Sequence, residues 1–482
     1  MRIFKLIFSR LFICLLIIAV FIVAIIFLCI YIHSVLPVAV VLLFAYVLSV
    51  SACVMLFSSD SPSEFKCAWL VAIIMLPVVG ATLFFLTRTH TVKGREERVM
   101  PISSYYRSKY YDDGADYLEE LTRLISLAKE SVYLEFYIIA KGDIWQGIYK
   151  NLLSALQRGV EVKIIYDAVG CAMRLPKRDF KRLKRAGAQI RSFHKPLPLP
   201  LYSINVRDHR KIAVIDKRYA FTGGVNVADE YAHLTSPHAF WKDGGAMFEG
   251  EIAIVFAELF LKLFDGIEKK KRRSDKPTSP VHNDSKSDVK PPHLTLSEGF
   301  TKPEKKLTPA LPIADSPHSN AIFENEIAKA IYCAERRVHI FTPYLCLGEK
   351  LCDALAYARQ KGADVKIIIP AVPDKKLTYA ISLTYGARLL ERGVEVYTYT
   401  PGFMHFKGMV CDGKGYIGSY NFDFRSTRLN FENGVLFGGE LTVQLEKDFL
   451  RSLALSKPLP QRRRNALNKL KDSLLCLFAP LV

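Results

Sequence analysis

The sequence lacks the cysteine spacing of a metal cluster or a disulfide-stabilised domain. Its ten cysteines include no Cys-x-x-Cys pair, and four of them lie within the first 67 residues among apolar neighbours. Zinc clusters and disulfide frameworks use closely spaced cysteines, so we expect neither. Scattered cysteines also favour a reducing compartment for the polar part of the chain.

The composition excludes two simple classes of protein. Half of the 482 residues are hydrophobic, which excludes a disordered chain, and 23% are charged, which excludes a chain made wholly of membrane helices. Lys and Arg number 66 against 47 Asp and Glu, a formal net charge of +19. This excess favours contact with anionic lipids or another polyanion. The length allows two or three folded units.

Long runs without charge occur only near the N-terminus, and they are residues 11–32, 35–57 and 68–86. A helix needs about 20 apolar residues to cross the hydrocarbon core of a bilayer. We therefore expect residues 1–90 to form a transmembrane anchor of two or three helices in a multi-pass protein of the cell membrane. Basic residues flank both ends of the anchor, so the positive-inside rule does not fix the orientation. We favour a cytoplasmic catalytic part.

Beyond residue 100 the chain contains one unit twice. RGVEVKII at 158–165 aligns with KGADVKII at 361–368, and Gly187 and Gly393 each precede the third strand of their unit. The predicted strands are 132–139, 160–167, 188–193 and 211–216 in the first unit, then 338–345, 363–370 and 394–400 in the second. Helices are predicted between them, at 145–158 and 351–360 for example. Strands that alternate with helices predict an α/β fold, here in two domains at 100–265 and 313–450.

Two basic segments flank the second unit. Residues 266–312 are rich in Pro, Ser and Lys and include the run Lys269–Arg273, so we expect a flexible basic linker. The linker is either simply solvated or touches anionic headgroups. Residues 451–482 form a basic amphipathic tail, which either lies on a membrane surface or packs on the domain.

One pattern of polar residues occurs in both units with the same spacing. DHRKIAVID at 208–216 contains His209, Lys211 and Asp216, and MHFKGMVCD at 404–412 contains the matching residues, which are His405, Lys407 and Asp412. A lone His-x-Lys is a weak signal, whereas its duplication indicates a shared site. Residues i and i+2 of a strand point to the same face, so each His and its Lys should project together into one cleft.

The residue types at this site suit a phosphate group. Lys donates hydrogen bonds and accepts none, and the downstream residues Asn226, Ser419 and Asn421 add amide and hydroxyl donors. One neutral imidazole can attack phosphorus, while the other protonates the departing alkoxide and later deprotonates the incoming alcohol. Each His is accompanied by a Lys that repels cations, so we expect no metal.

These motifs resemble the signature of the phospholipase D superfamily, HxKxxxxD, which is present twice. The resemblance is most specific to the bacterial cardiolipin synthases and extends from the second apolar run to near the C-terminus. It is carried by SPSEFKCAWLVAIIMLPVVGA, NVRDHRKIAVIDKRYAFTGGVNVADEY, PGFMHFKGMV and SYNFDFRSTRLNFENG. It implies two pseudo-twofold-related sheet domains with the site at their interface, preceded by a transmembrane helical segment.

The resemblance also implies a reaction and roles for residues. Two phosphatidylglycerols would give cardiolipin and glycerol through a phosphohistidine, without a cofactor, on a chain bound to anionic membrane lipids. His209 would be the nucleophile and His405 the acid and base. By resemblance, Asp243 and Glu432 are the downstream carboxylates that orient the histidines. The motif residues Asp216 and Asp412 would brace loops rather than touch substrate.

Three alternatives remain at this stage. Another phospholipase D-type phosphatidyltransferase, or a phospholipase, would use the same site with a different acceptor. A membrane-anchored nucleic-acid-binding protein or nuclease fits the net charge, although the sequence contains no evident aromatic and basic stacking platform. A catalytically inactive scaffold is the third. The turn after Asp412 is one residue shorter than the turn after Asp216, which we interpret as a shorter hairpin that keeps Ser419 and Asn421 in place.

Overall fold

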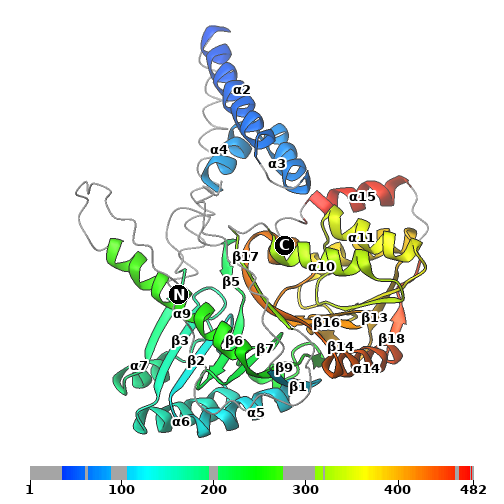
Figure 1. Cartoon of the computed structure of the whole chain (residues 1–482). Helices are drawn as coiled ribbons and strands as arrows, with labels where there is room; N and C mark the ends of the chain where they lie inside the picture. Colours follow the sequence, from blue (N-terminus) through cyan, green and yellow to red (C-terminus); the bar gives the residue numbers. More distant parts are fainter. Residues whose placement is uncertain are drawn as a thin grey trace, which may run out of the picture.

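The body of the protein consists of two α/β halves that lie side by side beneath a group of N-terminal helices (Figure 1). The computed structural model describes residues 35–59, 63–87, 106–194, 205–274, 310–317, 321–461, 466–477 and 479. Each half is built on one large sheet with helices on both of its faces. The α/β class predicted from the repeat is confirmed.

The sheet of the first half has seven strands. Their order across the sheet is β1 (Tyr106–Tyr111), β9 (Gly245–Gly250), β7 (Tyr219–Gly223), β6 (Lys211–Ile215), β2 (Ser131–Phe136), β3 (Glu161–Asp167) and β4 (Gln189–Phe193). The strands β2, β3 and β4 are parallel, and the others are antiparallel to their neighbours. The helices of this half are α5 (Gly114–Leu127), α6 (Asp143–Gln157), α7 (Lys177–Arg185) and α9 (Glu251–Ser274).

The second half repeats this strand order. Its sheet runs β10 (Leu311–Asp315), β17 (Asn430–Gly438), β16 (Lys414–Gly418), β15 (Gly408–Cys411), β11 (Arg337–Phe341), β12 (Asp364–Pro370), β13 (Glu395–Tyr399) and β18 (Ser456–Pro458). Its helices are α10 (Ile322–Cys333), α11 (Glu349–Gln360), α12 (Lys376–Glu391), α13 (Phe424–Arg428) and α14 (Glu440–Ala454). The parallel strands β2 and β11, at the centre of their sheets, are buried along nearly their whole length.

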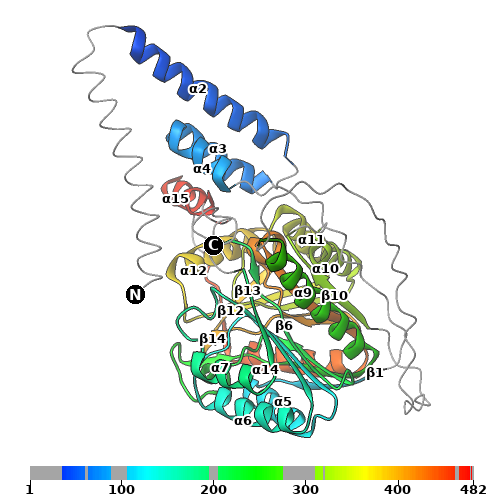
Figure 2. The same cartoon turned by 90° about the vertical axis from the view of Figure 1, so that its left-hand side faces the viewer.

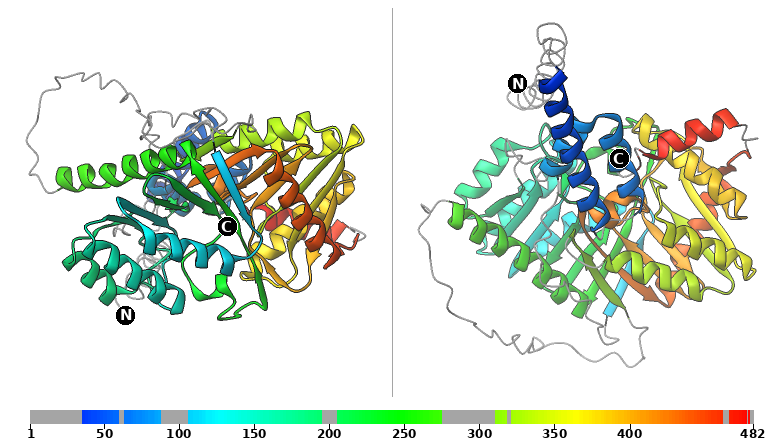
Figure 3. Two further views of the ribbon diagram at one scale, coloured as in Figure 1. Left: turned by 60° about the horizontal axis from the view of Figure 1, so that its bottom comes forward. Right: turned by 90° about the horizontal axis from the view of Figure 1, so that it is seen from above.

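Three apolar cores hold the body together. One lies under α5 and α6 in the first half, and one lies under α10, α11 and α12 in the second. The third core is shared, because α9 and α14 pack there with side chains from both sheets. The left view of Figure 3 shows α9 as the long green helix of the first half. The halves are therefore joined by a continuous core as well as by the linker.

Two short strand pairs also join the halves. β5 (Arg207–Asp208) runs parallel to β17, and β8 (Phe240–Lys242) runs parallel to β14 (Gly402–Met404). In each pair one strand belongs to the first half and the other to the second. Each pair leads directly into one of the two His-x-Lys motifs.

The N-terminal apolar runs at 35–57 and 68–86 fold differently. The run at 35–57 is one helix, α2 (Val35–Phe57), and within the described residues it alone is long and apolar enough to cross a membrane. The run at 68–86 is not one helix, because the chain bends at Leu76 between α3 (Ser63–Met75) and α4 (Pro77–Thr87). The run at 11–32 lies outside the described residues.

The bend at Leu76 has a local cause. Proline has no backbone N–H and its ring clashes with the preceding turn, so a helix starts readily at Pro77 but does not continue through it. The bend brings Gly80 against α3, where a Cβ atom would lie 2.2 Å from the carbonyl oxygen of Ala72. Residues 68–86, the third candidate span, therefore form two helices rather than one, and α3 and α4 pack against α2.

The linker and tail differ from the predicted boundaries. Helix α9 continues to Ser274, so the first residues of the expected linker are helical, and β10 begins at Leu311. Residues 275–309 lie outside the described part. In the tail, α15 (Ala466–Leu477) contacts α12 and α3. Viewed from above in Figure 3, α2–α4 lie over the body near the boundary between its halves.

Candidate active site

The first histidine is positioned by the second half of the molecule. His209 follows β5, and its backbone N–H donates to the carbonyl oxygen of Phe431 at 3.0 Å. Its Nδ1 lies 3.0 and 3.1 Å from the two carboxylate oxygens of Glu432. Glu432 is completely buried, whereas the His209 side chain is 12% exposed. The contact at Nδ1 leaves Nε2 as the reactive nitrogen.

The second histidine is positioned by the first half in the same way. The backbone N–H of His405 donates to the carbonyl oxygen of Lys242 at 2.8 Å, and its Nδ1 lies 2.5 Å from Asp243 Oδ2. Each carboxylate immediately follows the residue whose carbonyl accepts from the histidine. The pairing crosses between the halves, although each carboxylate lies downstream of its own half's histidine in the sequence. Neither half alone can therefore orient its histidine.

The two lysines contact the backbone of the histidines. The ammonium groups of Lys211 and Lys407 each donate to the backbone carbonyl of the histidine two residues earlier, and both side chains are fully buried. Lys407 Nζ also lies 2.8 Å from His405 Nδ1. The prediction that each His and its Lys share a strand is wrong. The histidines precede the strands β6 and β15, because at these positions the chain pairs with the opposite half.

Burial and mutual repulsion shift the basic groups. Burial, followed by the charge of Lys211, lowers the pKa of His209 to about 4, although Glu432 opposes this. Burial, Lys407, Lys211 and His209 lower the pKa of His405 well below its usual value. Burial also lowers the pKa of Lys211 to about 7 and that of Lys407 to about 8. The two lysines lower the pKa of both histidines, and the negative charge of a bound anion would raise it again.

The two carboxylates respond differently to burial. Burial raises the pKa of Asp243 to about 7, despite the charges of Lys407 and Lys211. Burial also raises the pKa of Glu432, but contacts with His209, Lys211 and Ser419 outweigh it, so that the pKa falls below its usual value. The Glu432 carboxylate therefore keeps its charge to lower pH than the Asp243 carboxylate does.

The predicted phosphate ligands are engaged within the fold. Ser419 Oγ donates to Glu432 Oε2, one of the two carboxylate oxygens that also contact His209 Nδ1. Asn226 accepts from Ile138 N at 3.1 Å and donates to Tyr231 Oη at 2.6 Å. Asn421 is buried, and its Oδ1 has no hydrogen-bond partner among the residues that the structure describes. Phosphate binding by these three residues stays a prediction.

The motif aspartates hold turns at the far ends of the strands. Asp216 accepts backbone N–H bonds of 2.7 to 3.1 Å from the three residues 129–131, and Asp412 accepts bonds of 2.9 to 3.0 Å from residues 335–337. Both aspartates have a positive φ, of 52° and 50°. These contacts connect each motif to β2 or β11 and place neither motif aspartate beside the histidines.

Aromatic side chains surround the histidines, and the sequence analysis did not single them out. The Tyr137 ring lies 5.1 Å from the His209 ring, and the rings of Tyr231 and Trp241 lie 5.4 and 5.2 Å from that of His405. Tyr137 follows β2 at the carboxyl end of the parallel strands, where ligand sites of α/β sheets usually occur. That position was the signal available for Tyr137, whereas Trp241 is placed by the β8–β14 pair.

Comparisons with known proteins agree with this geometry. A family model described as "Cardiolipin synthase, PLD-like domain" matches residues 121–236 and 327–453. An uncharacterised protein of Streptococcus mutans is 32% identical over 388 residues, which cover 79% of this chain and 80% of the relative. A cardiolipin synthase of a Geobacillus species is 32% identical over 370 residues, which cover 74% of this chain and 68% of the relative.

A solved structure has a similar fold. The crystal structure of a phosphatidylserine synthase from Haemophilus influenzae superimposes with a TM-score of 0.57 at 17% identity. The match covers 80% of this chain and 95% of that chain. The likeness concerns the fold, with its two sheets joined side by side.

Proposed function

Because the chain belongs to the cardiolipin synthase family with phospholipase D-like domains, and so to the phosphatidyltransferases, we propose that it converts two phosphatidylglycerols into cardiolipin and glycerol. The observation that carries the proposal is the pair of histidines, each held by a carboxylate of the opposite half and accompanied by a buried lysine. Such a site has two imidazoles for one phosphorus atom, as a two-step transfer requires.

In the first step, Nε2 of His209 attacks the phosphorus of one phosphatidylglycerol. The bond between phosphorus and the headgroup oxygen breaks, and protonated His405 gives its proton to that oxygen. Glycerol leaves, and the phosphatidyl group stays on His209. The negative charge of the bound phosphate raises the low pKa of His405 and so makes this proton available.

In the second step, the headgroup of another phosphatidylglycerol supplies the nucleophile. His405 takes the proton of its primary hydroxyl, the oxygen attacks phosphorus, and the phosphorus–nitrogen bond to His209 breaks. Cardiolipin forms, and both histidines return to their starting state. Lys211 and Lys407 hold the phosphate oxygens throughout, because a buried ammonium group stabilises the charge that develops there.

The assignment of His209 as nucleophile is supported by the carboxylates. A phosphorylated imidazole carries positive charge, which the ionised Glu432 beside His209 stabilises. Burial raises the pKa of Asp243, so the negative charge beside His405 is less firmly held, and Asp243 is the less suitable partner for a phosphohistidine. In this scheme Ser419 positions Glu432, Asn226 and Asn421 shape the pocket around the phosphate, and Asp216 and Asp412 brace the turns.

We propose a location in the cell membrane, where the substrate is concentrated. Helix α2 supplies one candidate span, and the apolar run at 11–32 would make the protein multi-pass. We place the catalytic part on the cytoplasmic side. The excess of positive charge would attract anionic phosphatidylglycerol to the site.

The proposal is tested with the full chain in membranes that contain phosphatidylglycerol as the only phospholipid. Equal amounts of cardiolipin and glycerol are expected, and neither should form with a His209→Ala variant of equal membrane abundance. Phosphatidic acid as the sole product would contradict the synthase assignment and indicate a phospholipase. Salt-sensitive retention of DNA without any lipid turnover would indicate the nucleic-acid alternative.

A further inference from the structure

The C-terminal helix α15 has one packed side and one exposed side. Leu475 and Cys476 pack against the core of the second half, whereas Leu470 and Leu474 are 58% and 53% exposed. Residues four apart lie on the same face of a helix, so the two exposed leucines form a small apolar surface that faces away from the body. Lys471 beside them is also exposed.

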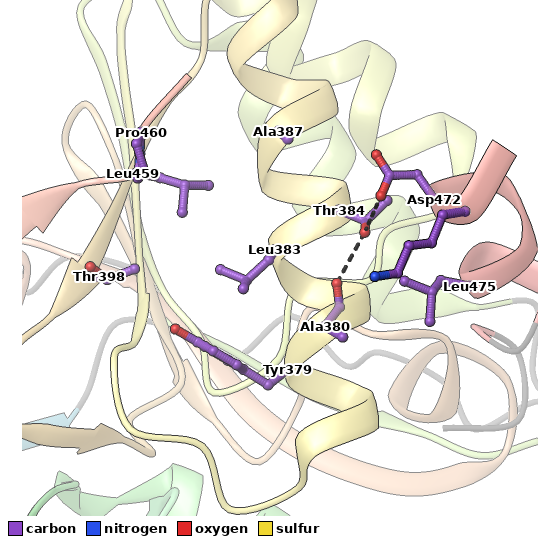
Figure 4. A pocket seen from close by; sticks show the side chains of 11 residues that line it. Tyr379, Ala380, Leu383, Thr384, Ala387, Thr398, Leu459, Pro460, Asp472 and Leu475 are labelled. Carbon is purple, nitrogen blue, oxygen red and sulfur yellow. Dashed lines mark hydrogen bonds between the residues drawn. The ribbon is translucent and has the colours of Figure 1, made fainter. Parts of the chain in front are cut away.

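The packing of α15 on the body is incomplete. A groove of about 410 Å³ separates α15 from α12, and residues such as Leu383, Leu459 and Leu475 line it (Figure 4). A hydrogen bond of 3.5 Å from Thr384 to Asp472 crosses this groove. Leu383, Leu459 and Leu475 are therefore only partly buried where they line the groove.

Helix α15 lies next to the N-terminal helices α2–α4. Helix α15 contacts α3, and Phe65 of α3 contacts Phe424 of α13 with ring centroids 6.2 Å apart. Figures 1 and 2 show α15 at the end of the body that carries α2, α3 and α4. The exposed apolar side chains of this group include Ile74 and Met75 at 64% and 73%. Helix α15 therefore lies at the end of the body from which α2, the candidate membrane span, projects.

The first turn of α12 adds to this surface. Lys375 and Lys376 are exposed, and Leu377 after them is 48% exposed. Basic residues next to exposed leucines are the composition of segments that lie in the headgroup region of anionic membranes. Lys375 Nζ lies 5.2 Å from the centre of the Tyr344 ring, and the ring of Phe403 lies between Tyr344 and His405, 6.3 and 5.8 Å from their rings. This turn is therefore connected to the catalytic histidines through aromatic contacts.

We propose that α15 and the first turn of α12 form a second membrane contact, which lies in the interface of an anionic phospholipid bilayer beside α2–α4. This contact turns the end of the body that carries α12 and α13 toward the lipid. The contact rests on the proposed function in one respect, because it would orient the active site toward a lipid substrate in the bilayer. It does not depend on which phosphatidyl transfer occurs.

The contact is tested by photo-crosslinking in the full chain, reconstituted in phosphatidylglycerol-containing bilayers. A benzophenone amino acid replaces Leu470 or Leu474 in turn. Leu43 of α2, which is 62% exposed, serves as the positive control, and Leu450 of α14, which is 48% exposed at the opposite end of the body, serves as the negative control. We expect phospholipid adducts at 470 and 474 at yields near that of position 43. Yields equal to that of position 450 would overturn the proposal.

A second experiment measures the consequence for turnover. The double variant Leu470→Glu, Leu474→Glu is compared with Leu450→Glu. The double variant should show about a tenfold lower kcat/KM in bilayers and nearly unchanged turnover with short-chain phosphatidylglycerol in micelles, because charge disfavours the interface but leaves the site intact. Unchanged turnover in bilayers would contradict the contact. The crosslinking yield needs no catalysis, so failure of the proposed reaction would remain distinguishable.

Discussion

The two histidine–carboxylate pairs have similar geometry, but they differ in the residue that lies next to the carboxylate. Ser419 donates its hydroxyl to Glu432 in the pair that holds His209. The position that corresponds to Ser419 is Gly224, where a Cβ atom would lie 2.2 Å from Asp243 Oδ1. One carboxylate therefore gains a hydrogen bond, and the other occupies the space that a side chain would need.

The two carboxylates also differ in charge. Against the effect of burial, His209, Lys211 and, least of all, the hydrogen bond from Ser419 hold the pKa of Glu432 below its usual value, whereas burial raises the pKa of Asp243 to about 7. In the proposed mechanism, this difference assigns the phosphohistidine to His209 and the proton transfer to His405. The following predictions would break or sharpen this comparison.

The largest effect is expected from removing either imidazole. His209→Ala and His405→Ala should each lower cardiolipin formation by at least about 10³-fold, because each variant loses a group that takes part in both steps. The measurement is the initial rate of glycerol release in bilayers. Membrane abundance of the variants serves as the control. Substantial activity in either variant would show that one imidazole is enough.

The second largest effect is expected from replacing the two carboxylates, and the loss of kcat should differ between them. Glu432→Gln removes the charge beside the nucleophile and should lower kcat by about 10²-fold, whereas Asp243→Asn should cost about tenfold. Both replacements keep the shape of the side chain, and thermal unfolding of each variant checks that the fold persists. Equal losses from the two variants would contradict the proposed difference in charge.

Smaller effects are expected at Gly224 and Ser419, the residues next to the two carboxylates. Gly224 should tolerate no side chain, whereas Ser419 should need its hydroxyl. Gly224→Ala should displace Asp243 and lower kcat by about tenfold, with a loss of about 1 to 3 kcal/mol in unfolding free energy from overpacking. Ser419→Ala removes one hydrogen bond and should cost about threefold to tenfold in kcat without the steric loss. A Gly224→Ala variant with normal stability would show that the close approach to Asp243 is not required.

The smallest effect concerns pH. Lys211 and Lys407 have pKa values lowered to about 7 and 8, so they lose their charge as the pH rises through this range. The value of kcat/KM, which reports the free enzyme, should therefore decline from pH 7 to 9. Asp243 raises the pKa of Lys407, so Asp243→Asn should move this decline to lower pH. A shift toward higher pH would contradict the assignment.

The sequence predicted the parts of the site that depend on local order. The motifs around His209 and His405 follow from spacing and from a repeated strand pattern, and the turn-bracing role of Asp216 was implied by the family resemblance. The strands themselves follow from apolar periodicity. Such signals are contained within a few residues of each other, so they can be recognised without coordinates.

What the sequence did not predict depends on tertiary contacts. The crossed pairing of His209 with Glu432 requires knowledge of the β5–β17 pair, which joins residues more than 200 positions apart. The role of Ser419 next to Glu432 has the same origin. The bend before Pro77 could have been predicted from the proline, but the high hydropathy on both sides of it outweighed that signal.

The central claim is that His209 bonds to phosphorus while His405 transfers the proton. It is tested most directly with a radiolabelled phosphatidyl ester of 4-nitrophenol, whose leaving group needs no proton. The His405→Ala variant should release about one equivalent of 4-nitrophenolate in a burst and keep the label on His209, whereas His209→Ala should show no burst. A burst from His209→Ala, with the label on His405, would contradict the account.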